Sequence, residues 1–179
     1  IYHGLVYQGQ QETALKSSEK AIVINSFSKY FCMTGWRIGW MILPEELLRP
    51  VEKLAQSLFI SPPELSQIAA TAALDAKQEL EIVKDGYARN RAYLLSALPK
   101  IGFDELLPVD GAFYIYADTS KFSNDSLTFT KTMLNEAGVA ATPGADFDKI
   151  NGSRFTRFSF AGDHAEMELA VECLGNWLR

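Results

Sequence analysis

The stretch Ile22–Leu43, IVINSFSKYFCMTGWRIGWMIL, decides the fold of this 179-residue chain. Its first three residues are β-branched and apolar, which predicts a strand buried on both faces. The polar residues Asn25 and Ser26 then favour hydrogen bonds from side chain to backbone over strand pairing, so the strand should end there. Lys29 should therefore lie at or just beyond the strand end, where open α/β sheets bind their ligands.

A second apolar run, Trp36–Leu43, predicts another strand and carries Arg37, whose guanidinium needs an anion. A lysine attacks carbonyl carbon when burial or a neighbouring positive charge lowers its pKa, and Arg37 is a candidate neighbour for Lys29. Hydroxyl donors such as Ser26, together with a guanidinium, suit a phosphate. The three residues thus describe a site for an aldehyde that carries a phosphate, and pyridoxal 5′-phosphate (PLP) fits. A solvated lysine and a surface arginine are the alternative for the residues taken alone.

The residues 26–29 (SFSK) and 33–39 (MTGWRIG) closely resemble the lysine signature of class I/II aminotransferases, which are fold-type I PLP enzymes. The resemblance implies that Lys29 forms the Schiff base with PLP and moves the proton between the substrate carbon and the cofactor. It also implies that Ser26 and Arg37 hold the phosphate.

The string Ser-x-x-Lys also marks serine β-lactamases and penicillin-binding proteins, in which the serine is the nucleophile. Those enzymes also carry Ser-Asp-Asn and Lys-Thr-Gly. The nearest strings here are Ser-Asn-Asp at 123–125 and Lys-Thr-Met at 131–133, and neither matches. The incomplete motif set argues against this reading.

The beginning of the chain is Ile1-Tyr2-His3-Gly4 rather than a methionine, and it reads as a strand end that enters a turn. In the resembled family this string continues an Asp-Glu-Ile-Tyr motif, whose aspartate pairs with the pyridine nitrogen and whose tyrosine bonds the phenolic oxygen of PLP. Tyr2 matches that tyrosine, and the aspartate lies outside the chain. We therefore expect the C-terminal half of an enzyme about twice as long. The remainder would carry the phosphate-binding glycine loop, the aromatic residue that stacks on the ring, and the aspartate.

Composition agrees with a soluble enzyme, with 47% hydrophobic and 22% charged residues. The net charge of −5 and the lack of a basic run argue against nucleic acid as a partner. Cys32 and Cys173 are too few for a disulfide framework, which predicts a reducing, cytoplasmic compartment. No apolar segment approaches the roughly 20 residues of a membrane helix. His3 and His164 are the only histidines and are far apart, so we expect no metal site.

Apolar residues at helical spacing predict helices near 44–58, 62–72, 77–98 and 127–137 and from 163 onward. Ser61 is expected to cap the second of these helices, with Pro62 at its first position and Glu64 completing a capping box. The apolar side chains of this helix, Leu65 and Ile68 among them, are expected to form its buried face. Strands are predicted at 113–117 and 155–161. Beyond residue 103, strands and helices alternate, which predicts a smaller α/β unit.

Arg157 is the second candidate for chemistry, in the strand predicted at 155–161. Alternation puts it on one face with Phe155 and Ser159. If that face is inward, the guanidinium is partly buried and a carboxylate is its natural partner. An edge-strand arginine in water is the alternative. Residues 157–161 (RFSFA) resemble the aminotransferase motif that binds the α-carboxylate of the amino acid, which implies that role for Arg157.

Two further segments resemble the family more loosely, namely 110–114 (DGAFY) and 143–147 (PGADF). In both, a turn is an adequate reason for the glycine. The family usually has glycine after the phenylalanine of the second segment, whereas Asp148 follows Phe147 here. This departure leaves the shape of the loop open.

The fold class expected is α/β, as the C-terminal part of a fold-type I PLP-dependent transferase. Residues 1–75 would end the large PLP-binding domain, and residues 76–179 would form an interdomain helix and the small C-terminal domain. The expected reaction moves an amino group from an amino acid to a 2-oxo acid. A homodimer is the usual assembly of the family, and neither a membrane nor a nucleic-acid partner is expected.

Two alternatives to this function stay open. The motifs do not separate an aminotransferase from a carbon–sulfur lyase of the same fold that catalyses β-elimination. An isolated fragment without the glycine loop and the aspartate could also be a non-catalytic binding module, and we expect it to be inactive alone. The sequence does not indicate which substrate side chain is preferred, because Arg157 would bind only the carboxylate shared by all amino acids.

Overall fold

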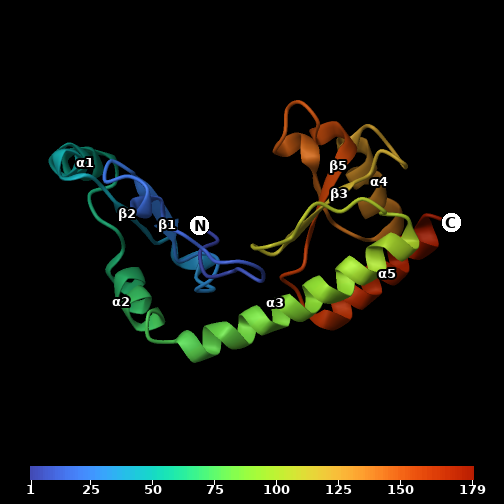
Figure 1. The fold of residues 1–179 in the computed structure, drawn as a ribbon, viewed down its shortest axis with the longest axis horizontal. Helices are drawn as coiled ribbons and strands as arrows, with labels where there is room; N and C mark the ends of the chain where they lie inside the picture. Colours follow the sequence, from blue (N-terminus) through green and yellow to red (C-terminus); the bar gives the residue numbers. More distant parts are fainter. The chain divides into compact units, whose positions relative to one another are not determined.

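The computed structural model describes all 179 residues, which form two compact units, Ile1–Lys84 and Asp85–Arg179. Figure 1 labels their main elements. The first unit contains η1 (Ala14–Lys16), β1 (Val23–Ser26), η2 (Thr34–Trp36), β2 (Gly39–Ile42), α1 (Glu45–Leu58) and α2 (Glu64–Ala73). The helix α3 (Lys77–Ala97) begins in the first unit and continues into the second. The second unit adds η3 (Leu98–Ile101), β3 (Tyr114–Asp118), α4 (Ser126–Ala137), β4 (Thr142–Pro143), η4 (Gly144–Asp146), η5 (Gly152–Arg154), β5 (Phe155–Ser159) and α5 (His164–Trp177).

The first unit is built on an antiparallel pair, β1 and β2, in which Ser26 lies opposite Gly39. The segment between the strands packs on α2. Its buried side chains form one apolar cluster with a small residue of that helix, comprising Phe27, Met33, Ile38 and Ala70. The hydroxyl of Ser66, also on α2, donates a 2.8 Å hydrogen bond to the carbonyl of Trp36. The inner side of the segment that carries Lys29 is therefore fixed by α2.

The first strand differs from the expectation of burial on both faces. It starts at Val23 and pairs along one edge only, with β2, and the Ile24 side chain is 66% exposed. Antiparallel sheets commonly leave one face solvated, and Ile24 lies on such an exposed face here, so that part of the prediction was wrong for this chain. The second strand is also shorter than predicted, because Arg37 interrupts the extended backbone with a left-handed conformation.

The start of α2 is another correction. The helix begins at Glu64, and Pro63 occupies the N-cap position without a side-chain hydrogen bond, so the predicted Ser61 cap is absent and Pro62 lies outside the helix. The face that packs inward also differs. Leu65 is 75% exposed, whereas the small residues Ser66 and Ala70 are buried. Small side chains let the helix approach the Lys29 segment closely.

The second unit is organised around a three-stranded antiparallel sheet with the order β3, β5, β4. One face of this sheet contributes to an apolar core with the surrounding helices. The fully buried members of this core are Leu98, Phe103, Ile115, Met133, Phe160 and Leu174. The prediction of a strand–helix alternation beyond residue 103 is confirmed.

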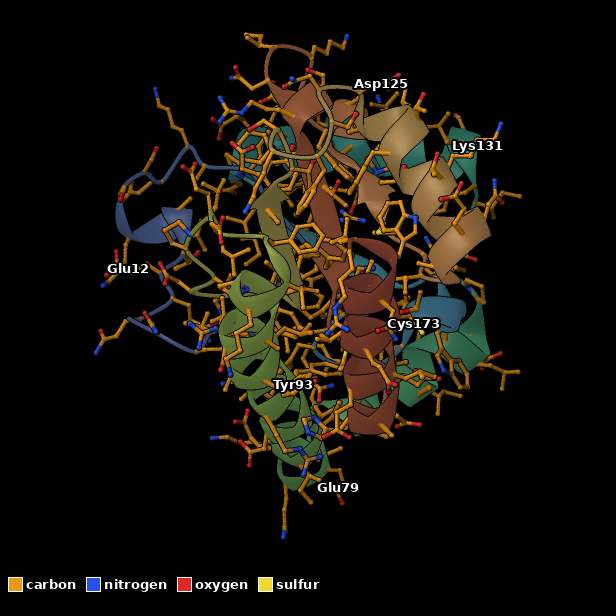
Figure 2. The ribbon with its side chains drawn as sticks, turned by 90° about the vertical axis from the view of Figure 1, so that its right-hand side faces the viewer. Glu12, Glu79, Tyr93, Asp125, Lys131 and Cys173 are labelled. Atoms are coloured by element: carbon orange, nitrogen blue, oxygen red, sulfur yellow. The ribbon has the colours of Figure 1, made fainter.

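The helix α4 follows its local signals closely. Asp125 is the N-cap and its carboxylate accepts a 3.1 Å hydrogen bond from the backbone N–H of Thr128. Gly138 ends the helix in the left-handed conformation, with φ of 69°. Figure 2 labels Asp125 at the N-terminal end of this helix.

The helices α3 and α5 lie side by side in the second unit (Figures 1 and 2). Asn90 of α3 is 2% exposed and joins them to the end of β5. Its amide nitrogen donates to the carbonyls of Phe160 at 3.1 Å and Gly162 at 2.8 Å. Its amide oxygen lies 2.8 Å from Nδ1 of His164, the first residue of α5. One buried amide thus fixes the chain where β5 turns into α5.

Candidate active site

Lys29 lies three residues beyond the end of β1, in the position expected from the sequence. The backbone folds back around it. The N–H of Met33 donates to the carbonyl of Phe27 at 3.1 Å, and the N–H of Cys32 donates to the carbonyl of Lys29 itself at 3.1 Å. Because the side chains of Phe27 and Met33 are buried, they anchor this short loop on both sides of the half-buried lysine.

Tyr2 and Lys29 are brought together although 27 positions separate them in the chain. Nζ of Lys29 lies 5.9 Å from the centroid of the Tyr2 ring, within the range of a cation–π contact. A turn in which the N–H of Leu5 donates to the carbonyl of Tyr2 at 2.9 Å holds the tyrosine, and Leu5 is 2% exposed. The phenol is therefore a neighbour of the lysine amine.

Hydroxyl groups cluster on the strand side of the lysine. Ser26 Oγ accepts a 3.0 Å hydrogen bond from the N–H of Ser28 and contacts Ser28 Oγ at 2.9 Å. The hydroxyl of Thr34 donates to the carbonyl of Ser28 at 2.6 Å. Ser28 was not among the residues predicted from the sequence to bind the phosphate. Its position beside Ser26 makes it a second hydroxyl at this site.

Arg37 follows η2 in a left-handed conformation, with φ of 51° and ψ of 49°. This backbone conformation is costly for a residue with a Cβ atom, by about 1 kcal/mol. One guanidinium nitrogen, Nη1, donates to the carbonyl of Thr34 at 2.8 Å. The side chain is otherwise exposed, so its remaining N–H groups are available to an external anion.

The donor set of this cluster fits a phosphorylated aldehyde. An amine can bond to the carbonyl carbon, and a guanidinium with hydroxyl groups can bind phosphate oxygens. Lys29, Arg37, Ser26 and Tyr2 supply these groups from one unit of the chain. Residues of this kind could hold PLP.

Tyr30 was missed by the sequence reasoning. Its hydroxyl donates a 2.6 Å hydrogen bond to a carboxylate oxygen of Glu81 on α3, and its ring lies against the backbone of Gly4, where a Cβ atom would clash. Burial and the Glu81 carboxylate raise the pKa of Tyr30 to about 12. Tyr30 thus ties the residue next to Lys29 to the helix and to the turn that follows Tyr2. The contact joins positions 51 apart, so no local pattern could have revealed it.

Arg157 belongs to the second unit, on the middle strand of its sheet. It pairs with Tyr116 of β3 and Thr142 of β4. The face of β5 that enters the core carries Thr156 and Phe158, so Arg157 lies on the opposite face and is half-buried. Arg157 is therefore neither on the inward face nor on an edge strand, which were the two alternatives considered from the sequence.

The guanidinium of Arg157 is flanked by two aromatic rings. Its central carbon lies 4.1 Å from the ring centroid of Tyr114 and 4.1 Å from that of Phe147. Nη2 makes one long contact, 3.4 Å, to the hydroxyl of Thr142, and the buried Nε has no hydrogen-bond partner in the chain. An unsatisfied buried donor is rare in folded proteins, and a planar anion such as a carboxylate would satisfy it.

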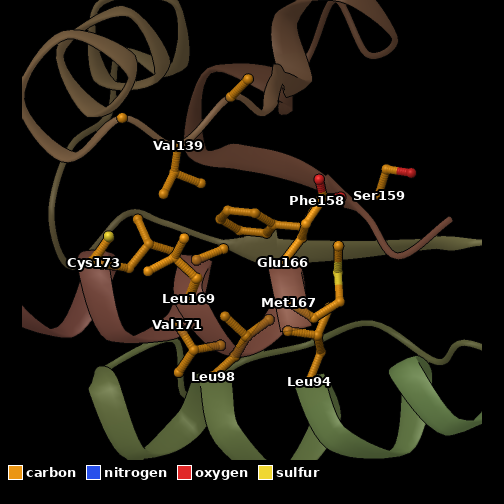
Figure 3. A pocket seen from close by; sticks show the side chains of 14 residues that line it. Leu94, Leu98, Val139, Phe158, Ser159, Glu166, Met167, Leu169, Val171 and Cys173 are labelled. Carbon is orange, nitrogen blue, oxygen red and sulfur yellow. The ribbon is translucent and has the colours of Figure 1, made fainter. Parts of the chain in front are cut away.

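An apolar cavity of about 450 Å³ also lies in the second unit, between α3, β5, α5 and the chain that follows α4. Figure 3 shows Leu94, Leu98, Val139 and Phe158 pointing into it. None of the predicted site residues lines this cavity. The chain contains no grouping of three or more His, Cys, Asp or Glu side chains that could hold a metal ion. None of its helices has both the length and the apolar character needed to cross a membrane.

The family model for aminotransferase class I and II matches residues 1–174. A valine–pyruvate aminotransferase of Mycobacterium tuberculosis is 50% identical over 99% of this chain and 47% of its own length. A (5-formylfuran-3-yl)methyl phosphate transaminase of Methanocaldococcus jannaschii is 36% identical over 99% of this chain and 48% of its own length.

The solved structures that resemble this chain are also aminotransferases. A crystal structure of an aminotransferase from Mycobacterium tuberculosis has a TM-score of 0.96 at 49% identity, covering 99% of this chain and 47% of that one. An aspartate aminotransferase variant of Thermus thermophilus has a TM-score of 0.89 at 28% identity, covering 98% of this chain and 48% of that one. The chain spans about half the length of the curated relatives that it matches.

Proposed function

Because the chain belongs to the class I and II aminotransferases, with their PLP-dependent fold type I, we propose that the complete protein containing it moves an amino group from an amino acid to a 2-oxo acid. The observation that carries this proposal is the contact of the Lys29 amine with the Tyr2 ring, 5.9 Å apart, in the segment that also carries the paired hydroxyls of Ser26 and Ser28. When bound, PLP supplies the aldehyde that accepts the amino group and a ring that withdraws electrons.

Lys29 is the proposed point of covalent attachment and the proton carrier. Its Nζ would hold the cofactor through the aldehyde group, and the same amine would carry the α-proton of the amino acid. A loop anchored by two buried side chains, Phe27 and Met33, suits this role because a proton acceptor must keep its position.

The other residues of the first unit would bind and orient the cofactor. Ser26 and Arg37 would bind the phosphate, with the adjacent hydroxyl of Ser28 as a further donor. The Tyr2 phenol would donate to the phenolic oxygen of PLP. The 5.9 Å between the Tyr2 ring and Nζ of Lys29 supports this assignment, since the aldehyde and that oxygen are neighbouring substituents of one small ring.

Arg157 would bind the α-carboxylate of the amino acid and of the 2-oxo acid. The unsatisfied Nε and the long contact of Nη2 support this assignment, because the chain itself does not use the donors that a carboxylate needs. Since the carboxylate is common to all substrates, this residue would set orientation rather than side-chain preference.

We further propose that residues 1–75 end the large cofactor domain and that residues 76–179 form an interdomain helix and the small domain. The compact units Ile1–Lys84 and Asp85–Arg179 support a division near this point. We also propose that the complete protein is a homodimer, which is the assembly usual in the family. The two free cysteines of this chain, Cys32 and Cys173, support a cytoplasmic location. The relative that is 50% identical is named for valine and pyruvate, so this pair is the first donor and acceptor to test.

The test is the visible absorbance spectrum of the complete protein with PLP. The parent should show a band that changes on adding valine and is restored by pyruvate, and Lys29→Ala should lack that band at saturating PLP. Lys20→Ala removes an exposed lysine of the same unit and should leave the spectrum unchanged. A parent spectrum identical to free PLP would refute the proposed function and favour a non-catalytic module.

Product analysis separates amino transfer from β-elimination. An aminotransferase needs a 2-oxo acid to complete its cycle, whereas a carbon–sulfur lyase releases ammonia and pyruvate from a sulfur amino acid alone. Steady release of both products without added acceptor would overturn the assignment to amino transfer.

A further inference from the structure

Two aromatic rings from other segments contact the guanidinium of Arg157. Tyr114 comes from the start of β3 and Phe147 from the loop after η4, and each ring centroid lies 4.1 Å from the central guanidinium carbon. A cation stacked between two rings gains electrostatic attraction from each face. The stack also fixes the plane of the guanidinium, which the side-chain torsions of arginine otherwise leave free.

The loop that presents Phe147 is built rigidly although the ring itself is 54% exposed. The N–H groups of Phe147 and Asp148 both donate to the carbonyl of Gly144, at 2.9 and 3.0 Å. The Asp148 carboxylate accepts from the N–H groups of Ile150 at 2.8 Å and Asn151 at 3.1 Å. Asp148, the departure from the family pattern, therefore closes a turn of its own. These hydrogen bonds hold the loop in the conformation that places the Phe147 ring against Arg157.

We propose that Tyr114 and Phe147 are positioning residues that hold the plane of the Arg157 guanidinium, so that a carboxylate is accepted only along its edge. The proposal rests on the proposed role of Arg157. Because the two rings occupy space over the guanidinium carbon, the N–H edge is the part of the group left for a ligand, and a carboxylate that binds there lies in the guanidinium plane.

The kinetic test uses the complete protein with PLP, valine and pyruvate. Phe147→Leu keeps an apolar side chain but removes the ring face, and it should raise the KM for valine about threefold to tenfold with kcat within about twofold, as expected for lost binding that is equal in ground and transition states. Phe147→Tyr retains the ring face and should recover the parent KM. Ile150→Ala changes an 88% exposed side chain of the same loop and is the matched control.

A second readout needs no turnover. In protein labelled with ¹⁵N-arginine, the Nε–H resonance of Arg157, assigned through its loss in Arg157→Lys, should be displaced upfield by the two ring currents. It should move toward its ordinary position in Phe147→Leu and not in Ile150→Ala. Titration with pyruvate should shift this resonance in the parent at lower concentration than in Phe147→Leu.

The outcomes separate the two proposals. If Arg157→Lys weakens valine binding while Phe147→Leu leaves both the KM and the pyruvate titration unchanged, the positioning role is refuted and the carboxylate role survives. If Arg157→Lys also leaves the KM unchanged, the carboxylate role fails and the positioning role fails with it. If the parent shows no amino transfer, the pyruvate titration alone decides, and equal titrations of parent and Phe147→Leu overturn the inference.

Discussion

Gly144 is the position at which a single methyl group should do the most damage in the second unit. A Cβ atom built on its backbone would lie 2.5 Å from the carbonyl oxygen of Gly152, 2.6 Å from the hydroxyl oxygen of Tyr116 and 2.7 Å from the carbonyl oxygen of Phe155. Its φ is not positive, so the conformational freedom of glycine is not the reason for its presence. The turn explanation offered for this glycine from the sequence is therefore replaced by close backbone approach.

The expected cost of Gly144→Ala follows from these contacts. All three are far inside ordinary van der Waals separation, and two involve backbone, which cannot rotate away. Overpacking of this kind costs typically 1–3 kcal/mol. The reduced freedom of the unfolded chain returns about 0.5 kcal/mol. We therefore expect a loss near the upper end, about 2 kcal/mol, and the clash should also displace Phe147 from Arg157.

Gly86→Ala is the matched control. Gly86 lies inside α3, and no atom is within 4 Å of a Cβ built there. Alanine is favoured over glycine in a helix interior by about 1 kcal/mol, so this substitution should stabilise the same unit. The two substitutions add the same atom and are predicted to have opposite signs.

The assay is equilibrium urea unfolding of the complete protein, followed by far-UV circular dichroism and tryptophan fluorescence. The midpoint should fall for Gly144→Ala and rise for Gly86→Ala at constant slope. The close-approach reasoning would be wrong if the urea midpoint of Gly144→Ala equalled that of the parent within error and the Arg157 Nε–H resonance kept its position. Both results together would show that the loop relaxes around the added methyl group.

Tyr30 and Asp118 should each make the stability of the protein depend on pH. Burial and the Glu81 carboxylate raise the pKa of Tyr30 to about 12. Its contribution to the free energy of unfolding is therefore complete below the unfolded pKa of about 10 and is lost as the pH rises through about 12. Tyr30→Phe should remove this alkaline decrease in a plot of the urea midpoint against pH. Burial alone would raise the pKa of Asp118, but hydrogen bonds from Ser120 and Arg154 outweigh it and lower the pKa. Asp118 therefore contributes stability above about pH 4 that is lost as pH falls further, and Asp118→Asn should flatten the acid limb of the same curve. Unchanged slopes in either variant would contradict the corresponding assignment.

The parts of the fold that the sequence predicted well are those with local causes. The helix predicted near 127–137 is an example, because α4 runs from Ser126 to Ala137 and the Asp125 cap and the Gly138 end act within one turn of the helix. The position of Lys29 just beyond a strand was predictable for the same reason. The failed Ser61 cap shows the limit of local signals, since two successive prolines keep the chain extended until Glu64.

Other features depend on which segments meet. The exposure of Ile24 reflects the layers present around β1, which an apolar run cannot reveal. The hydrogen bond from Tyr30 to Glu81 and the two rings on Arg157 join separate elements. The chemical groups of the candidate site are therefore a prediction from the sequence, while the neighbours that hold them are visible only in the three-dimensional structure.

The left-handed backbone of Arg37 has a consequence for protein engineering. Any procedure that ranks substitutions by backbone compatibility will favour glycine at this position, because glycine relieves the conformational penalty at once. The resulting variant would have a higher calculated stability but would lack the guanidinium. Thermostabilisation of this protein should therefore leave Arg37 unchanged until its proposed role in phosphate binding has been tested.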